Sequence, residues 1–319
     1  MNVRLVLDWW PVGQGLFSSG RLHHDNQVAS WVYDCGTASS DRHLLGSLYD
    51  FGREHTAAGA DGIDFAVLSH FDRDHVSGFE RLVVRHPIHM VLLPYIPLWQ
   101  RLVIAAQQGI AAEDALFRFF VNPAGYLFSI PGQQIGGEVV FVPPAGSGGG
   151  EGGDGEFPSA PAPEGPRPSE LKVDYGAPPD DERPILAAHI FHDPPRVRYL
   201  AKGGRLLLPF WEFVPPYNDA ELSVRADAAF RAAAEPLIQR LIRPSRGSPA
   251  VALKKLRSLY DRTFGKTSSR RNQISLFLYS GPLDHCSCAD VMGGSPPVRA
   301  RRLGAFCAAQ SGRWHARYS

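Results

Sequence analysis

Four side chains of types that bind metal ions lie within a stretch of six residues. They are His70, Asp72, Asp74 and His75, in the segment Leu68–Gly78. Imidazole nitrogens and carboxylate oxygens are suitable ligands for Zn²⁺, Mn²⁺ or Fe²⁺. The spacing of two residues from His70 to Asp72 and Asp74 keeps these side chains on one side of an extended loop. The pattern predicts a metal site, and the alternative is a polar loop whose carboxylates cap the next helix.

This loop lies between a predicted strand and a predicted helix. The apolar run at 63–69 suits a buried strand, and residues 76–86 have helical periodicity. Sites in α/β folds lie where strands end, so the loop occupies a position typical of a functional site. Further strands are predicted at 3–9, 28–34, 88–93, 135–142, 185–191, 205–213 and 274–279. One further helix is predicted to follow the capping residues 39–41, and others are predicted at 97–121 (with a break at Gly109), 220–242 and 249–264.

The composition is that of a folded protein with a sizeable core. Of the 319 residues, 44% are hydrophobic and 20% are charged, which is ordinary for a globular chain. The formal net charge of +1 argues against a strong global positive field but leaves a local basic groove open. Four cysteines are too few for a disulfide scaffold. With no long apolar run and no signal-peptide core, we expect no membrane association and a cytoplasmic location.

The segment His70–His75 resembles the second motif of the metallo-β-lactamase superfamily, His-x-His-x-Asp-His. Asp72 stands in place of the second histidine, and this version is similar to that of the ComEC-like branch. Two segments near the N-terminus, Val12–Gly15 and Val32–Gly36, resemble the family's first hairpin and its first motif aspartate. Asn272–Leu276 resembles the Asn-x-x-Ser-Leu strand of the same branch.

The resemblance implies an α/β fold, the metallo-β-lactamase-like αββα sandwich of two mixed sheets with outer helices. Residues 1–144 would form the N-terminal half of this domain and residues 184–280 the C-terminal half, with a helical, basic insertion. Between them, 145–183 is predicted to be a flexible insert, because 145–181 contains 9 Gly and 7 Pro and little apolar bulk. Residues 281–319 are predicted to be an irregular tail, with truncation left open.

The same resemblance assigns roles to the residues of the loop. His70 and Asp72 would bind one divalent metal, and Asp74 and His75 a second, giving up to two Zn²⁺ or Mn²⁺ ions per chain. A metal-bound hydroxide oriented by Asp74 would attack an ester-type bond, commonly a phosphodiester of a nucleic acid or nucleotide. Asp34 would support the metal loop through hydrogen bonds. The implied protein is a hydrolase of the nuclease or phosphodiesterase type.

The later metal ligands of the family are not recognisable, since neither a Thr-Gly-Asp turn nor a His-His-Gly-Ser segment is present. Three explanations stay open. The chain is truncated or altered, the late ligands are residues that the motifs do not reveal, or the protein is a catalytically inactive interaction module with a protein partner. The candidates for such unrecognised ligands are His189, His192, Asp284 and His285. A zinc site built from His285, Cys286 and Cys288 is a weaker alternative.

Two further features leave alternatives open. The region 240–271 is basic, which suits a phosphate-rich substrate or is simply a solvated helix face. The substrate itself is either a phosphodiester polymer or a small ester, thioester or cyclic nucleotide.

Overall fold

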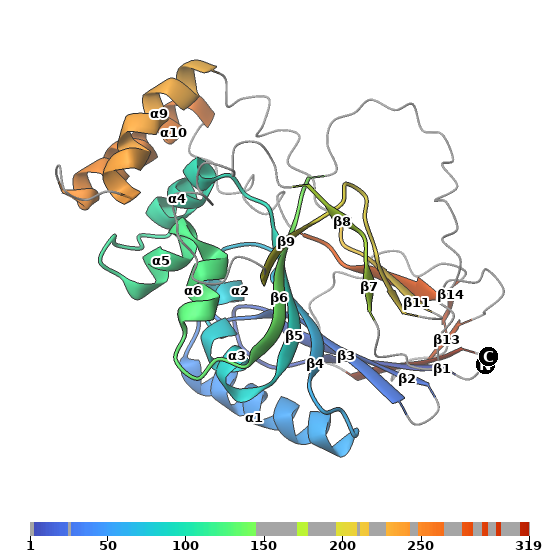
Figure 1. Cartoon of the computed structure of the whole chain (residues 1–319). Coiled ribbons are helices and arrows are strands. Elements are labelled where there is room, and N and C mark those ends of the chain that lie inside the picture. The colour runs from blue at the N-terminus through green and yellow to red at the C-terminus, as the bar shows by residue number, and fades with distance from the viewer. Residues whose placement is uncertain are drawn as a thin grey trace.

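Two β-sheets and a set of helices make up the computed structural model (Figure 1). The structure describes residues 3–24, 27–144, 171–177, 196–208, 211–216, 228–242, 248–264, 276–282, 289–292, 298–300 and 313–318. None of the described helices is both long and apolar enough to cross a membrane.

The larger sheet has eleven strands and is mixed. Its order is β14-β13-β15-β1-β2-β3-β4-β5-β6-β9-β8. The run β3-β4-β5-β6-β9 is parallel, and the remaining pairs are antiparallel. The strands are β1 (Val3–Trp9), β2 (Phe17–His24), β3 (Gln27–Cys35), β4 (Ile63–Val67), β5 (Ile88–Pro94), β6 (Ile135–Val142), β8 (Tyr175–Gly176), β9 (Val197–Leu200), β13 (Ala289–Met292), β14 (Val298–Ala300) and β15 (Arg313–Tyr318).

The smaller sheet has the order β12-β11-β10-β7, formed by β12 (Tyr279–Pro282), β11 (Trp211–Val214), β10 (Leu206–Leu208) and β7 (Lys172–Val173). All its described pairings are antiparallel, so the expectation of two mixed sheets is right for the larger sheet and wrong for this one. The sheets meet face to face: the ring centroid of Phe213 in β11 lies 4.9 Å from that of Trp31 in β3 and 4.8 Å from that of Phe65 in β4. The general α/β class is therefore confirmed.

The first helices follow strands of the larger sheet. They are α1 (Asp41–Ala57), α2 (Arg73–Val76), α3 (Phe79–Arg85), α4 (Leu98–Gln107), α5 (Ala115–Val121) and α6 (Pro123–Ser129). The predicted helix 76–86 is divided between α2 and α3 at Gly78, whose amide donates to the carbonyl of Cys35 at 2.8 Å instead of continuing one helix. The expected break at Gly109 is confirmed, because this glycine has φ +72° and follows the end of α4.

Two more helices, α9 (Ala228–Ile242) and α10 (Pro249–Phe264), lie side by side and pack on α4 (Figure 1). The prediction for 249–264 matches α10. Of the predicted helix 220–242, residues 228–242 form α9 and the rest lies outside the described residues.

Three expectations about the second half of the chain need correction. Residues 171–177 of the predicted insert form β7 and β8, which join both sheets, while 145–170 and 178–183 lie outside the described residues. The strand predicted at 274–279 is displaced, because β12 begins only at Tyr279. The tail predicted to be irregular contributes β13, β14 and β15, and β15 pairs with β1 from Val3↔Tyr318 to Asp8↔Arg313. The predicted strand at 185–191 lies outside the described residues.

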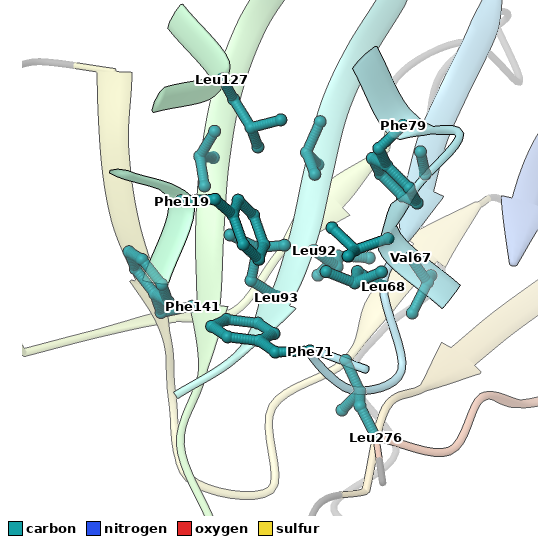
Figure 2. Close-up of a cluster of buried hydrophobic side chains, with 14 of the residues drawn as sticks. Val67, Leu68, Phe71, Phe79, Leu92, Leu93, Phe119, Leu127, Phe141 and Leu276 are labelled. Carbon is teal, nitrogen blue, oxygen red and sulfur yellow. The ribbon is translucent and has the colours of Figure 1, made fainter. Parts of the chain in front are cut away.

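The centre of the core lies where the parallel strands are covered on both faces. Val67, Leu68, Leu92 and Leu93 are fully buried there, which explains the nearly continuous apolar runs of β4 and β5. Figure 2 shows these side chains surrounded by Phe119 and Leu127 from α5 and α6, by Phe141 from β6 and by Leu276. This cluster supports the loop that carries the four candidate ligands.

Candidate functional site

The four predicted ligands lie on the loop that follows β4 and on the short helix α2. Leu68 extends the sheet by donating its amide to the carbonyl of Leu92 at 3.0 Å. Phe71 is 1% exposed and points into the core toward Phe119, with ring centroids 4.8 Å apart (Figure 2). The aromatic ring thus anchors the middle of the loop, between His70 and Asp72.

Asp34 forms the buried base of the site. Its side chain is fully buried and its backbone has φ +57°, a left-handed conformation that aspartate tolerates better than most residues. Oδ1 accepts the amide of Ser69 at 2.7 Å, and Oδ2 accepts the Ser69 hydroxyl at 2.6 Å. His75 Nδ1 lies 2.7 Å from Asp34 Oδ2, and because a carboxylate only accepts, this nitrogen donates. Asp34 thus binds the loop through both Ser69 and His75.

This arrangement leaves His75 Nε2 directed away from Asp34. A carboxylate bound to one imidazole nitrogen fixes the tautomer in which the other nitrogen carries a free lone pair. The ring of His75 is thereby prepared to act as a ligand through Nε2.

Ser69, His75 and Asp34 do not form the triad of a serine hydrolase. In a triad, the serine and the carboxylate contact opposite nitrogens of the histidine. Here the Ser69 hydroxyl donates to Asp34 and lies 3.3 Å from His75 Nδ1, the same nitrogen that the carboxylate binds. Ser69 is also 2% exposed, so its hydroxyl is inaccessible to a substrate.

The loop after β3 holds α2 in place. Thr37 donates its amide to Ser77 Oγ at 2.9 Å, and the Ser77 hydroxyl donates to the Thr37 carbonyl at 3.0 Å. Gly36 lies directly on the backbone of Asp74 and His75, where an added Cβ would come within 2.5 Å of the His75 carbonyl carbon. A larger residue at position 36 would therefore displace the site.

The four candidate ligands form two pairs. His70 Nδ1 lies 3.5 Å from Asp72 Oδ2, and His75 Nε2 lies 3.7 Å from Asp74 Oδ2. For a tetrahedral ion with bonds of about 2.0–2.1 Å, two ligand atoms are roughly 3.4 Å apart. Both separations are near this value. The His70 and His75 rings lie against each other, with centroids 3.7 Å apart.

All four side chains are reachable from solvent. The exposed fractions are 12% for His70, 24% for Asp72, 32% for Asp74 and 15% for His75. Together with the buried Asp34, three carboxylates face two imidazoles, a balance of charge that favours a bound cation.

The pKa values of the two histidines are shifted in opposite directions. Burial, together with the neighbouring His75, lowers the pKa of His70. Burial alone would also lower the pKa of His75, but the hydrogen bond and charge of Asp34, and the charges of Asp74 and Asp72, outweigh it and raise that pKa. The environment of His70 therefore favours its neutral form, the form that can act as a ligand, and the carboxylate of Asp34 orients the ring of His75.

Gln108, at the end of α4, also belongs to the site. Its amide nitrogen donates to Asp72 Oδ1 at 2.7 Å and to the Phe71 carbonyl at 3.1 Å, and its oxygen accepts the Arg73 amide at 3.0 Å. One oxygen of Asp72 is thus anchored while the other faces His70. Sequence reasoning missed Gln108, because a glutamine 36 residues from Asp72 carries no local signal.

A segment from the C-terminal half crosses beside the loop. Leu276 donates its amide to the Ser69 carbonyl at 2.7 Å, and its carbonyl accepts the Tyr33 hydroxyl at 2.7 Å. Leu276 is also fully buried in the core below Phe71 (Figure 2). The end of the predicted Asn272–Leu276 motif therefore reaches the site, while 272–275 lie outside the described residues.

Each of the two pairs offers two donor groups of types that bind divalent cations. Within the part of the chain that the structure describes, no three His, Cys, Asp or Glu side chains are grouped so that they could hold a metal ion. The sequence candidates for additional ligands, His189, His192, Asp284 and His285, all lie outside the described residues, as do Cys286 and Cys288.

In the comparisons with known proteins, no family model matches the chain and no curated protein matches it.

Proposed function

We propose that the protein is a metal-dependent hydrolase of the metallo-β-lactamase fold that cleaves phosphodiester bonds of a nucleic acid or nucleotide. The observation that carries this proposal is the arrangement of His70 with Asp72 and of Asp74 with His75 as two donor pairs 3.5 Å and 3.7 Å apart. They lie at the carboxyl ends of parallel strands, where α/β proteins place their sites.

The layering of the chain supports the fold assignment. A mixed sheet and a second sheet pack face to face through Trp31, Phe65 and Phe213. In Figure 1, α1 and α3 lie on the side of the larger sheet away from the smaller one. This is the order of layers expected for three of the four layers of the αββα sandwich.

The residues have separable roles in this proposal. Asp34 holds His75 with Nε2 free, and Gln108 holds Asp72 with one oxygen free. Asp74 is the most exposed of the four candidate ligands, which suits the role implied by the resemblance, that of orienting the attacking water. When bound, Zn²⁺ or Mn²⁺ lowers the pKa of water and offsets negative charge on the phosphoryl oxygens.

The first test is the metal content of the purified protein, measured by elemental mass spectrometry after dialysis against Zn²⁺ or Mn²⁺. We expect close to two ions per chain in the wild type and at least one fewer in Asp74→Ala. The matched control is Asp61→Ala, which removes an exposed carboxylate just before β4, at the end of this strand opposite the loop, and retains the full content.

Turnover is tested on the same samples with the phosphodiester bis(4-nitrophenyl) phosphate and the carboxylic ester 4-nitrophenyl acetate. The proposal expects hydrolysis of the phosphodiester by the loaded wild type and the Asp61→Ala control, and loss of at least about 100-fold in Asp74→Ala. Hydrolysis of the acetate alone would indicate that the protein acts on small carboxylic esters and not on phosphodiesters.

A wild type that binds fewer than one ion per chain and cleaves neither substrate would overturn the proposal. The protein would then be the inactive interaction module that the missing late motifs suggest.

A further inference from the structure

We infer that the α9–α10 helix pair is a docking arm for the phosphate backbone of a nucleic acid, separate from the candidate hydrolytic site. The inference rests on the proposed function only for the choice of a phosphodiester polymer as the partner. It is carried by the distribution of charge along the chain and by the way this helix pair is attached to the site.

The charge of the chain is strongly uneven. Residues 228–264 contain eight Lys and Arg against two acidic residues, a net charge of +6. Since the whole chain has 33 basic and 32 acidic residues, the remainder has 25 and 30, a net charge of −5. A nearly neutral protein thus concentrates positive charge in one tenth of its length, which is the electrostatic signature of a polyanion contact.

The basic side chains of this pair lie on its solvent side. In α10, the residues Ala252, Leu253 and Leu256 are buried. The exposed basic residues of the two helices are Arg231, Arg240, Lys254, Lys255, Arg257 and Arg262. At 100° per residue, the four basic residues of α10 span about 160° of the helix surface, centred opposite its buried residues, so they form a broad exposed positive stripe.

The apolar side of the pair fixes it to the body of the protein. Phe230, Ala234 and Ile238 recur at helical spacing in α9 and are all buried. The ring of Phe230 meets that of Trp99, near the start of α4, in an edge-on contact with centroids 5.1 Å apart. The positive stripe is therefore held by a packed interface and is not a mobile tail.

The same helix α4 connects the arm to the candidate site. Trp99 near its beginning contacts α9, and Gln108 at its end contacts Asp72. Nine residues of helix separate these two contacts by about 14 Å. At the duplex rise of about 3.4 Å per phosphate, about 14 Å corresponds to roughly four nucleotides, so a nucleic acid that engages both ends of α4 is longer than a dinucleotide.

The test measures binding of fluorescein-labelled single-stranded DNA of 12 nucleotides by anisotropy, with the full chain in EDTA so that no hydrolysis occurs. The variant is Lys254→Gln/Lys255→Gln/Arg257→Gln, which removes three charges and keeps good helix formers. The matched control is Arg42→Gln/Arg53→Gln/Arg85→Gln, which removes three exposed charges from α1 and α3.

We expect the wild type to bind with a steep salt dependence. Each phosphate contact contributes about 0.7 to the slope of log K against log salt for a single strand, so the α10 variant lowers this slope by about 2. Its affinity at 0.1 M salt then falls by about 100-fold, while the control stays within about threefold. A labelled dinucleotide is expected to bind equally weakly to all three proteins, because it cannot span the arm.

Three outcomes would overturn the inference. The first is a wild type without salt-dependent binding. The second is an equal loss in the control and the α10 variant, which would indicate a diffuse charge effect. The third is competition by polyglutamate of equal charge as effective as that by DNA, which would point to an acidic protein instead. Because the assay contains no metal, a failed hydrolysis test leaves the binding result intact, and a failed binding test leaves the hydrolysis result intact.

Discussion

Substitution of Asp34 tests the core of the site most directly, because one buried carboxylate holds both the loop and the histidine. We consider three variants. Asp34→Ala removes the side chain, Asp34→Asn keeps its shape without its charge, and Asp34→Gly also relaxes the left-handed backbone at φ +57°. All three leave the exposed surface unchanged, since Asp34 is fully buried.

The expected magnitudes follow from the contacts that are lost. Asp34 accepts three hydrogen bonds of 2.6–2.7 Å, two from Ser69 and one from His75. Hydrogen bonds to a buried charge are worth about 1.5–3 kcal/mol each but are not additive, so Asp34→Ala is expected to lower the free energy of unfolding by about 3–5 kcal/mol. Asp34→Asn should cost about 1–3 kcal/mol, because its amide retains part of the network. The free energy of unfolding of Asp34→Gly should be about 1 kcal/mol higher than that of Asp34→Ala.

Urea unfolding at pH 7 measures these differences, and nitrogen NMR of the His75 ring reports its tautomer above its titration range. In the wild type we expect the proton on Nδ1, and in Asp34→Ala we expect the Nε2–H form to become populated. An Asp34→Ala variant within 1 kcal/mol of the wild type, with the proton still on Nδ1, would refute the reasoning that Asp34 organises this site.

Three further predictions concern the surroundings of the site. Gln108→Leu removes the anchor of the loop and is expected to weaken Zn²⁺ or Mn²⁺ binding, measured by calorimetry, by about 10–100-fold. Phe213→Ala removes the ring between the two sheets and should cost about 3–5 kcal/mol in urea unfolding. Burial and the neighbouring His55 lower the pKa of His86 to about 4. His86 therefore binds protons less readily in the folded protein than in the unfolded chain, so it destabilises the fold as the pH falls below about 6.5. His86→Phe should therefore lose about 1 kcal/mol less stability than the wild type between pH 7 and pH 5, after allowance for solvent screening.

Each of these predictions has a matched control in the chain. Gln107→Leu changes the neighbouring glutamine of α4 and should leave cation binding unchanged. Phe277→Ala trims an exposed ring, 42% of which is accessible, and should cost less than about 0.5 kcal/mol. His43→Phe makes the same replacement at an exposed histidine of α1 and is the control for the third variant. Equal effects in a variant and its control would contradict the corresponding explanation.

Much of the fold is readable from local pattern. The predicted strands at 3–9 and 135–142 coincide with β1 and β6, and the helix predicted at 249–264 coincides with α10. β4 and β5 are marked by apolar runs with turn residues at their ends, and each of these signals lies within a few positions of the chain. Such signals are properties of a contiguous segment, so they survive without knowledge of the rest of the chain.

The less predictable elements are those that depend on distant partners. β15 is formed by Arg313–Tyr318, a polar segment whose strand character comes from pairing with β1 at the other end of the chain. The short strands β7 and β8 likewise have only two residues each and exist through their partners β10 and β9. Two residues are too few for a hydrophobic period to mark β7 or β8, and the partner strand of β15 lies at the other end of the chain.

At the site, the sequence alone determined which side chains are available, since His70, Asp72, Asp74 and His75 are neighbours whose types specify their chemistry. The tertiary structure decided how they are used. The left-handed turn at Asp34 places its carboxylate on His75, 41 residues away, and the end of α4 brings Gln108 to Asp72, 36 residues away. Contacts of this length depend on the order and packing of whole strands and helices, which no local pattern of residues encodes.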